Sequence, residues 1–403
     1  MYMTSQAVAA LIEGSCRTFR MVLELPTGRR LPSKLIRSGQ SQAYTTSCSD
    51  DIELGAVCSA QWELEVYEED VELNIIGREV RLYLYLADLG MTGMATYGDL
   101  EVHTWDTLGH YACEDIPDLA EMVGGELIPM GEYICVRLSR TAPICRVTLA
   151  DELYATDKPY HPRLPMHYTR YPLSMFPALS SDVEKDICKQ LGIGNANAYR
   201  KPDDLLARGG VWLYAAGRVK LRAADYDFTI KSIPKGTTMR QMLSYIASAN
   251  GQIGYVGRDG KYIRKWYGVP VKALDPDAID TPSLSRSENT IAGIICKVSE
   301  NVTLTQGDTS GSYGRVIEFE NPYMHESMML PLLQKLQTME WSTASVRMRL
   351  GDPRVDPADV LTYTDAENTT HNIPAMSLCY TYDGGLSADV SAFGQSTDEA
   401  IDE

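Results

Sequence analysis

The sequence predicts a multidomain α+β protein in which β-rich regions at both ends of the chain flank a mixed α/β middle region. The chain has 403 residues, which is more than one ordinary hydrophobic core accommodates. Both ends contain short apolar segments with alternating side chains, bounded by Gly and Pro, as β-strands do. The middle contains two segments with apolar residues at three- and four-residue spacing, which is typical of amphipathic helices.

Changes in these patterns divide the chain into three domains and a tail. We expect an N-terminal β-rich domain at residues 1–150, an α/β middle domain at 151–284 and a C-terminal β domain at 285–396. The segment DKPYHPRLPMHYTRYP, rich in Pro and Tyr, follows the first boundary. Residues 397–403 are expected to form an acidic tail.

The N-terminal region is expected to begin with a short helix at residues 5–13 and to continue as strands. WELEVY alternates Trp62, Leu64 and Val66 with glutamates, as a strand with one solvent-exposed face does. FRMVLEL, REVRLYLYL, GEYICVRLSR and ICRVTLADEL are further predicted strands. Regularly spaced strands with turns between them favour a β-barrel or a β-sandwich.

Two helices are predicted in the middle region. In SDVEKDICKQLGI, Ser181 or Asp182 is expected to cap the helix, which ends at Gly192. In TTMRQMLSYIASAN, Thr237 or Thr238 is the expected cap. Between these helices, VWLYAAGRVKLR and DFTI are predicted strands, which makes the region mixed α/β.

The second helix is followed by a predicted β-hairpin. QIGYV and KYIRKWYG are the strands, and Asp259-Gly260 is the most turn-like pair between them. Tyr262 and Trp266 fall on one face of the second strand. We interpret the helix and hairpin, residues 239–268, as a scaffold unit. A binding surface built on the two aromatic residues is the alternative.

Strands are predicted again from about residue 285, interrupted by one helix, SMMLPLLQKLQTM. The predicted strands are IAGIICKVSE, GRVIEFE, ASVRMRL, DVLTYT, NIPAMSLCYTYD and LSADVSAFG. A turn joins the last two, and a positive φ is expected there at Gly384 or Gly385. A bulkier residue at such a position should therefore lower stability.

Composition and charge argue against several classes of function. The formal net charge is −17, whereas direct wrapping of nucleic acid needs a basic surface, so we expect no specific nucleic-acid binding. No apolar run approaches the length of a membrane span, so we expect no membrane anchor. The nine cysteines form no C-x-x-C pair, and no signal peptide precedes them. We expect reduced, mostly buried thiols in a protein made in a cytoplasm.

No residues form a recognisable catalytic, cofactor-binding or metal-binding set. G-x-S-x-G elbows, P-loops and dinucleotide fingerprints are absent from the sequence. His161 and His167 have no carboxylate at zinc-like spacing, so we interpret them as ordinary loop histidines. Asp352, Asp356 and Asp359 suggest a metal site or a carboxylate pair, but Asp-Pro turns leading into a strand explain them better. The sequence therefore predicts neither an enzyme nor a cofactor.

The order of several segments carries a family resemblance. An early strand of one family resembles the segment LGAVCSAQWELEVY. The end of that family's first domain resembles IPMGEYICVRLSR with CRVTLADELY, and its Asn-Pro turn before a helix resembles EFENPYM. DVEKDICKQLGI and the unit at 239–268 match the middle helices and hairpin. GDPRVDPADVLTYT and the turn at Asp383–Gly385 are the most specific part. Together these segments resemble the hub proteins at the tip of bacteriophage tails and of related contractile injection systems.

The resemblance implies structural work in a virion. Such hubs are homotrimers in which each chain contributes two related, tube-like β-barrel domains, so three chains form a ring of nearly sixfold symmetry. The ring joins the sixfold tail tube to a threefold spike or tip fibre, and it surrounds the exit channel of the tape-measure protein and DNA. The implied partners are a distal tail protein or tail tube ring, a separate spike or tip fibre protein, and the tape-measure protein. The chain would be made in the bacterial host cytoplasm.

Two other readings of the sequence remain open. Hubs of many non-contractile phages continue into a long C-terminal lysin or receptor-binding region, whereas this sequence stops soon after FGQSTDEAIDE, so a built-in hydrolase is not expected. Scattered Asp and Glu residues nevertheless leave a tail-associated cell-wall hydrolase as one alternative. A distal-tail or tube-like ring protein is the other.

Overall fold

The computed structural model describes residues 1–13, 18–31, 33–46, 52–67, 73–87, 127–164, 166–168, 173–197 and 227–394. The N-terminal β region contains α1 (Gln6–Glu13), η1 (Ser33–Leu35) and the strands β1 (Thr18–Glu24), β2 (Arg30–Leu31), β3 (Ile36–Tyr44), β4 (Gln61–Tyr67), β5 (Glu79–Ala87), β6 (Ile128–Thr141) and β7 (Ile144–Ala150). The C-terminal β region contains β16 (Ser283–Ser299), β17 (Val302–Gly307), β18 (Arg315–Glu320), α8 (Glu326–Leu336), β19 (Glu340–Met348), β20 (Val360–Thr364), β21 (Thr370–Pro374), β22 (Ser377–Tyr382) and β23 (Leu386–Ala392).

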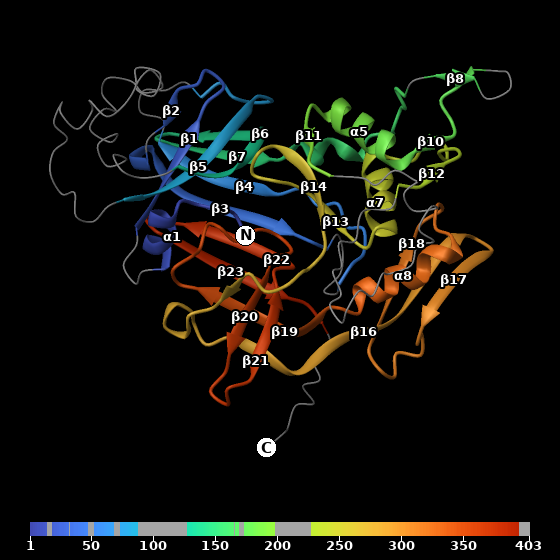
Figure 1. Cartoon of the computed structure of the whole chain (residues 1–403). Helices are drawn as coiled ribbons and strands as arrows, with labels where there is room; N and C mark the ends of the chain where they lie inside the picture. The colour runs from blue at the N-terminus through green and yellow to red at the C-terminus, as the bar shows by residue number, and fades with distance from the viewer. Residues whose placement is uncertain are drawn as a thin grey trace.

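The two β regions share one sheet (Figure 1). Its order is β17-β16-β19-β23-β22-β3-β4-β7-β6-β5-β1-β2, with β18 also paired to β16. The regions meet where β22 pairs antiparallel with β3, with Leu378 opposite Ala43 and Thr381 opposite Gln40. We call this pairing the β3–β22 joint. The sequence predicted a separate β unit at each end of the chain and did not predict this backbone connection.

Most local predictions in the N-terminal region are confirmed. Residues 6–13 form α1, one residue shorter than expected. In β4, Trp62, Leu64 and Val66 are buried, whereas Glu63 is exposed, as the alternation predicted. The predicted strand ICRVTLADEL ends earlier, at Ala150, because the following aspartate caps a 3-10 helix, η3 (Glu152–Asp157).

The middle region contains α5 (Ser180–Leu191), α7 (Met239–Ala249), β13 (Ile253–Val256) and β14 (Lys261–Lys265). Its short strands are β8 (His167–Tyr168), β9 (Leu173–Ser174), β10 (Ala178–Leu179), β11 (Gly194–Asn195), β12 (Thr229–Ile230) and β15 (Lys272–Ala273), followed by η4 (Pro276–Ala278). The predicted strand VWLYAAGRVKLR lies outside the described residues. The predicted hairpin is confirmed, with β13 and β14 antiparallel and Gly260 at φ 67° in its turn.

The two middle helices begin in different ways. In α7, the side chain of Thr238 accepts from the backbone N–H of Gln241, whose side chain returns to Thr238, which is a capping box. The predicted cap of α5 is wrong, because α5 starts after Leu179, whose side chain cannot cap. Asp227 instead accepts from the Ser181 backbone N–H at 2.9 Å and from the Ser181 hydroxyl at 2.8 Å. The predicted end at Gly192 is confirmed, with φ 81°.

Packing supports the scaffold interpretation of the hairpin over a binding surface. Tyr262 is 0% exposed and Trp266 is 7% exposed, so neither ring presents a face to solvent. Arg264, on the same strand, forms an ion pair with Glu184 of α5 at 2.7 Å, and both side chains are fully buried. The hairpin is therefore fixed to the helix by its inward-facing side chains.

One strand belongs to two parts of the fold. The first half of β16 pairs with β19 in the joined sheet, whereas the second half pairs with β18 from Ile291 to Lys297 and with β17 from Gly293 to Ser299. We call the second half of β16, with β17, β18 and α8, the arm (Figure 1). Asn321, in the Asn-Pro turn of the arm, donates to the Tyr245 carbonyl of α7 at 2.7 Å. The arm is therefore attached to the middle region.

Candidate functional site

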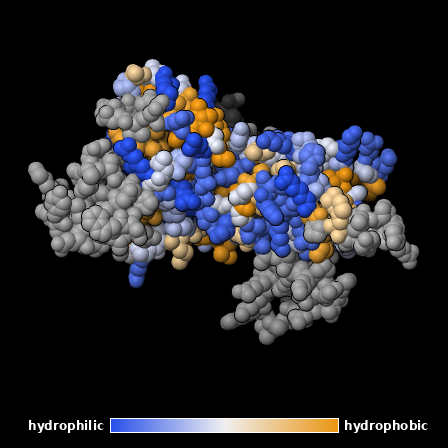
Figure 2. All heavy atoms as spheres, turned by 90° about the horizontal axis from the view of Figure 1, so that it is seen from above, coloured by the Kyte–Doolittle hydropathy of each residue, from blue (hydrophilic) through white to orange (hydrophobic). Residues whose placement is uncertain are grey.

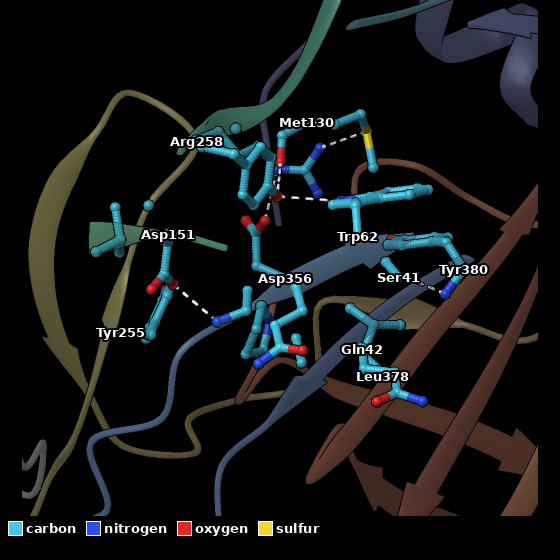
Figure 3. A pocket seen from close by; sticks show the side chains of 18 of the residues that line it. Ser41, Gln42, Trp62, Met130, Asp151, Tyr255, Arg258, Asp356, Leu378 and Tyr380 are labelled. Carbon is cyan, nitrogen blue, oxygen red and sulfur yellow. Dashed lines mark hydrogen bonds and ion pairs between the residues drawn. The ribbon is translucent and has the colours of Figure 1, made fainter. Parts of the chain in front are cut away.

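Arg258, in the turn between β13 and β14, reaches the place where the two β regions meet (Figure 3). Its Nε pairs with Asp356 Oδ1 at 2.6 Å. Nη1 donates to the Pro129 carbonyl of β6 at 3.1 Å, and Nη2 donates to the Val355 carbonyl at 2.9 Å. The Tyr2 ring lies 5.4 Å from the guanidinium carbon. We call Arg258 with its partners the Arg258 clasp, because it connects all three regions through one side chain.

A small cavity of about 60 Å³ adjoins the Arg258 clasp (Figure 3). Trp62 donates to Tyr133 Oη at 3.1 Å, and Tyr133 donates to the Met130 carbonyl at 2.9 Å. Asp151, Tyr255 and Tyr380 also line it. A space of this size holds water molecules, whereas drug-sized ligands need several hundred cubic ångströms. We therefore interpret the cavity as part of a structural junction.

The three aspartates considered as metal or catalytic candidates each face a cation. Asp356 belongs to the clasp, Asp359 Oδ1 lies 2.5 Å from Lys265 Nζ, and Asp352 pairs with both Lys272 and Arg354. Burial favours neutral Asp352, but hydrogen bonding from Arg354 and the Lys272 charge outweigh it and hold the pKa of that carboxyl well below its usual range. This arrangement fits turns that anchor the middle region rather than a catalytic pair.

The solvent-facing side of the joined sheet is polar across the β3–β22 joint. Thr148, Glu63, Gln40, Thr381 and Ser387 follow one another in register across β7, β4, β3, β22 and β23. A hollow of about 640 Å³ lies over this row and is lined mainly by polar and charged side chains. We call this surface the polar face. It spans both β regions without interruption.

Charges on the polar face are largely paired with one another. Glu65 Oε1 lies 3.0 Å from Arg146 Nε, and Glu65 Oε2 lies 3.2 Å from Arg37 Nη1. Arg137, Glu63 and Asp383 complete the charged lining, so three arginines accompany three carboxylates. Such a surface offers hydrogen bonds but no strong field of one sign, so it does not attract a polyanion strongly.

Ser342, His371 and Asp365 form a hydrogen-bonded row that the sequence analysis missed. Ser342 Oγ lies 3.1 Å from His371 Nδ1, and His371 Nε2 lies 3.1 Å from Asp365 Oδ2. These residue types recur in serine hydrolases, where the serine must reach a substrate carbonyl. Ser342 is 0% exposed and His371 is 5% exposed. No local motif marks the row, because its members come from β19, β21 and the turn between β20 and β21.

Other candidate ligands remain separate in the described part of the chain. No group of three or more His, Cys, Asp or Glu residues there could hold a metal ion. The six cysteines within the described ranges are thiols that form no disulfide: Cys58, Cys135, Cys145, Cys188, Cys296 and Cys379. Four of them are buried, as expected, whereas Cys16, Cys48 and Cys113 lie outside those ranges. No described helix has the length and apolar character needed to cross a bilayer.

Hydrophobic residues on the surface do not suggest a ligand site. On the face shown in Figure 2, they form several separate patches among hydrophilic residues. Val269, Tyr313 and Met3 are the most exposed large hydrophobic side chains among the residues described, at 82%, 85% and 82%. They come from three distant segments. Among the residues described, the exposed hydrophobic side chains therefore do not gather into one apolar site.

Comparison with known proteins provides a fold match. No family model matches the chain, and no curated protein sequence matches it. The 43 kDa tail protein of prophage MuSo2 from Shewanella oneidensis is similar over 93% of this chain and 98% of its own, with a TM-score of 0.51 and 10% identity. A tail protein from Neisseria meningitidis MC58 is similar over 94% and 97%, with a TM-score of 0.52 and 10% identity.

The chain shares its fold with phage tail proteins. The likeness covers nearly the full length of both chains, so it includes the two β regions and the middle region together. At this level it agrees with the resemblance inferred from the sequence. The finer expectations, a hub, a trimer and a junction with a spike, are questions of assembly.

Proposed function

We propose that the chain is a structural subunit of a phage tail and that it forms the hub at the tail tip or baseplate. The full-length fold likeness to two phage tail proteins is the observation that carries the tail assignment. The hub assignment rests on the sequence resemblance and on the way the chain joins its β regions. A single polypeptide with two β regions in one sheet suits an adaptor between rings of different symmetry.

In this proposal three copies form a ring. Each copy contributes two β-barrel units linked by the β3–β22 joint, so the ring has six similar units facing the sixfold tube. Its other side presents threefold symmetry to a separate spike or tip fibre protein. The Arg258 clasp and the buried Arg264–Glu184 pair support this role, because a subunit that carries load needs fixed regions.

We assign the polar face to the wall of the exit channel. The tape-measure protein and DNA would pass along it, with a distal tail protein or tube ring above. The paired charges of Glu65 with Arg37 and Arg146 support this assignment, because a polyanion that must move past a wall should not bind there. The net charge of −17 acts in the same direction.

The proposed role is not enzymatic, and the protein acts as a virion component. The Ser342 row is the arrangement closest to a catalytic site among the described residues, and burial of the Ser342 hydroxyl keeps it from substrate. We assign this row to attachment of the β20–β21 hairpin onto β19. A peptidoglycan digestion assay with purified protein and an S342A control tests the hydrolase alternative. Release of fragments that S342A abolishes would establish it.

Two measurements test the hub. Light scattering on the purified protein should give three times the chain mass of 44.7 kDa, and electron microscopy of tails should place threefold density at the distal end of the tube. Sixfold density would assign the chain to a distal-tail or tube-like ring instead. Absence of the chain from purified tails would overturn the tail assignment itself.

A further inference from the structure

Several carboxylates gather where the hairpin turn meets the N-terminal β region. Glu152, the first residue of η3, experiences the charges of Asp151, Glu132 of β6 and Glu79 of β5. Arg81 pairs with Glu132 at 2.9 Å and with Glu79 at 3.5 Å. These four carboxylates therefore outnumber Arg81, the cation that pairs with two of them.

The hairpin turn packs directly on one of these carboxylates. A Cβ atom placed on Gly260 would lie 2.1 Å from Glu132 Oε2, so the turn has no space between it and the Glu132 side chain. Arg258, two residues earlier, donates to the Pro129 carbonyl of the same strand. Repulsion between Glu132 and the neighbouring carboxylates therefore acts on the contact between the hairpin turn and β6, to which Arg258 also binds.

Glu152 differs from its neighbour Asp151 in the support that its carboxylate receives. Asp151 accepts from the Ser59 hydroxyl at 2.6 Å and from the backbone N–H groups of Ala60 at 2.8 Å and Leu153 at 3.0 Å. Glu152 Oε2 is buried and has no hydrogen-bond partner among the described residues. A charge on Glu152 is therefore desolvated with only a backbone hydrogen bond from its own residue to offset the cost, which disfavours ionisation.

The groups around Glu152 come from every element packed against it. Glu79 on β5, Asp151 at the start of η3, and Glu132 and Tyr133 on β6 interact with Glu152 itself. The cations act on these neighbours: Arg81 and Lys261 on Glu132, Arg240 on Asp151, and Arg258 on Tyr133. Most of the cations already have carboxylate partners: Arg240 with Asp157, Arg258 with Asp356 and Lys261 with Asp259. Within the described ranges, these ion pairs direct the three cations to carboxylates other than Glu152.

We propose that proton loss by Glu152 weakens the packing of the hairpin turn against β5 and β6. This contact between the middle and N-terminal regions would then depend on pH. Burial, with the charges of Asp151, Glu132 and Glu79, raises the pKa of Glu152 to about 7. When folding raises the pKa of a carboxyl, the contribution of that carboxyl to stability is fully present at a pH below its pKa in the unfolded chain. For Glu152 this contribution is lost as the pH rises through about 7. The contact between the hairpin turn and the N-terminal region is therefore more stable in mild acid than in mild base.

Hydrogen exchange and urea unfolding of the E152Q variant test the proposal. In the wild-type protein, protection of the hairpin-turn amides, corrected for intrinsic exchange, should fall about tenfold between about pH 6 and about pH 8. E152Q should lose most of this fall, because glutamine does not titrate and the pKa of Asp151, raised by burial to about 6, lies at the lower edge of the pH range. The control E300Q, at an exposed residue outside this group, should retain it. An equal fall in E152Q and the wild-type protein would overturn the proposal.

A second variant keeps the test independent of the packing of a glutamine at residue 152. Glu79 is 56% exposed, so E79Q should leave the fold intact while removing one charge that repels the Glu152 carboxylate. The midpoint of the pH-dependent fall in protection should then move to lower pH. Infrared absorption of a protonated carboxyl near neutral pH, absent in E152Q, gives a direct readout. An unchanged midpoint in E79Q would contradict the proposed repulsion.

Discussion

The β3–β22 joint and the Arg258 clasp connect the same two β regions in different ways. The joint distributes the connection over backbone pairs from Ser377 opposite Tyr44 to Tyr382 opposite Gly39. The clasp concentrates it in one guanidinium that bonds to Asp356 and to two carbonyls. A distributed connection tolerates the loss of any one member, whereas a concentrated one does not. Substitutions should therefore have unequal effects at the two places.

The largest effect is expected from R258A, which removes the centre of the clasp. Arg258 is 10% exposed, and its removal takes from Asp356 its main cationic partner and from the Pro129 carbonyl a donor, whereas the Val355 carbonyl keeps the Tyr380 hydroxyl. Breaking a buried pair from one side costs about 3 to 5 kcal/mol, which urea unfolding would measure. K261A in the same hairpin should change stability much less, because Lys261 is 50% exposed and its ion pair with Asp259 is screened by solvent. Equal losses would show that the clasp is not concentrated.

The second effect concerns the hairpin that carries the clasp. A Cβ on Gly254 would lie 2.2 Å from Tyr262 Oη, and the buried Tyr262 ring has little room to move. G254A should therefore lower the free energy of unfolding by about 2 to 3 kcal/mol through overpacking. G268A is the matched control, since no neighbouring heavy atom lies within 4 Å of its added Cβ. If G254A left the free energy of unfolding unchanged, the hairpin would be able to move enough to accommodate the added methyl group.

The joint itself is tested by S41A. The Ser41 hydroxyl accepts from the Tyr380 backbone N–H at 2.8 Å, inside the joint, where both residues are buried. Its removal leaves a buried donor unsatisfied, which costs about 1 to 2 kcal/mol. S377A, on the partner strand β22 and half-buried, should change stability little. A loss for S41A larger than for R258A would reverse the comparison between joint and clasp.

The smallest effect is expected at the turn between β22 and β23. Gly384 has φ 69°, which L-residues adopt at a cost, whereas Gly385 has no positive φ. G384V should therefore lower the melting temperature by an amount corresponding to about 1 kcal/mol, because no neighbouring atom lies within 4 Å and only the backbone is strained. G385V should be milder. A larger loss of stability in G385V than in G384V would contradict the assignment of the backbone strain to Gly384.

The sequence predicted features whose determinants lie close together in the chain. The cap at Thr238 and the hairpin turn at Gly260 depend on a few consecutive residues, and both are confirmed. The cap of α5 is supplied by Asp227, 46 residues beyond Ser181, so the local pattern there suggested the wrong residue. Capping from a distance depends on tertiary folding, which no short pattern contains.

The functional surfaces were less predictable for the same reason. Ser41 and Tyr380 are separated by 339 residues, so the joint and the polar face that crosses it exist only after both β regions have folded together. The Asp352–Asp359 loop could be interpreted as turns from its Asp-Pro pairs, but its cationic partners, Lys265 and Lys272, could not be identified. Long-range pairs of opposite charge leave no periodic signal along the chain.

Strand β16 gives the molecule a mechanical property. It is a single run of 17 residues, about 55 Å of backbone if fully extended, and it belongs to both the joined sheet and the arm. A force applied along the arm passes through this covalent backbone into the sheet. The force loads the interstrand hydrogen bonds in shear, so several must break together before the strand slips. The strand departs from regular register between Leu284 and Glu288 in the joined sheet and between Ile291 and Gly293 where the arm begins, and such irregularities bend a strand.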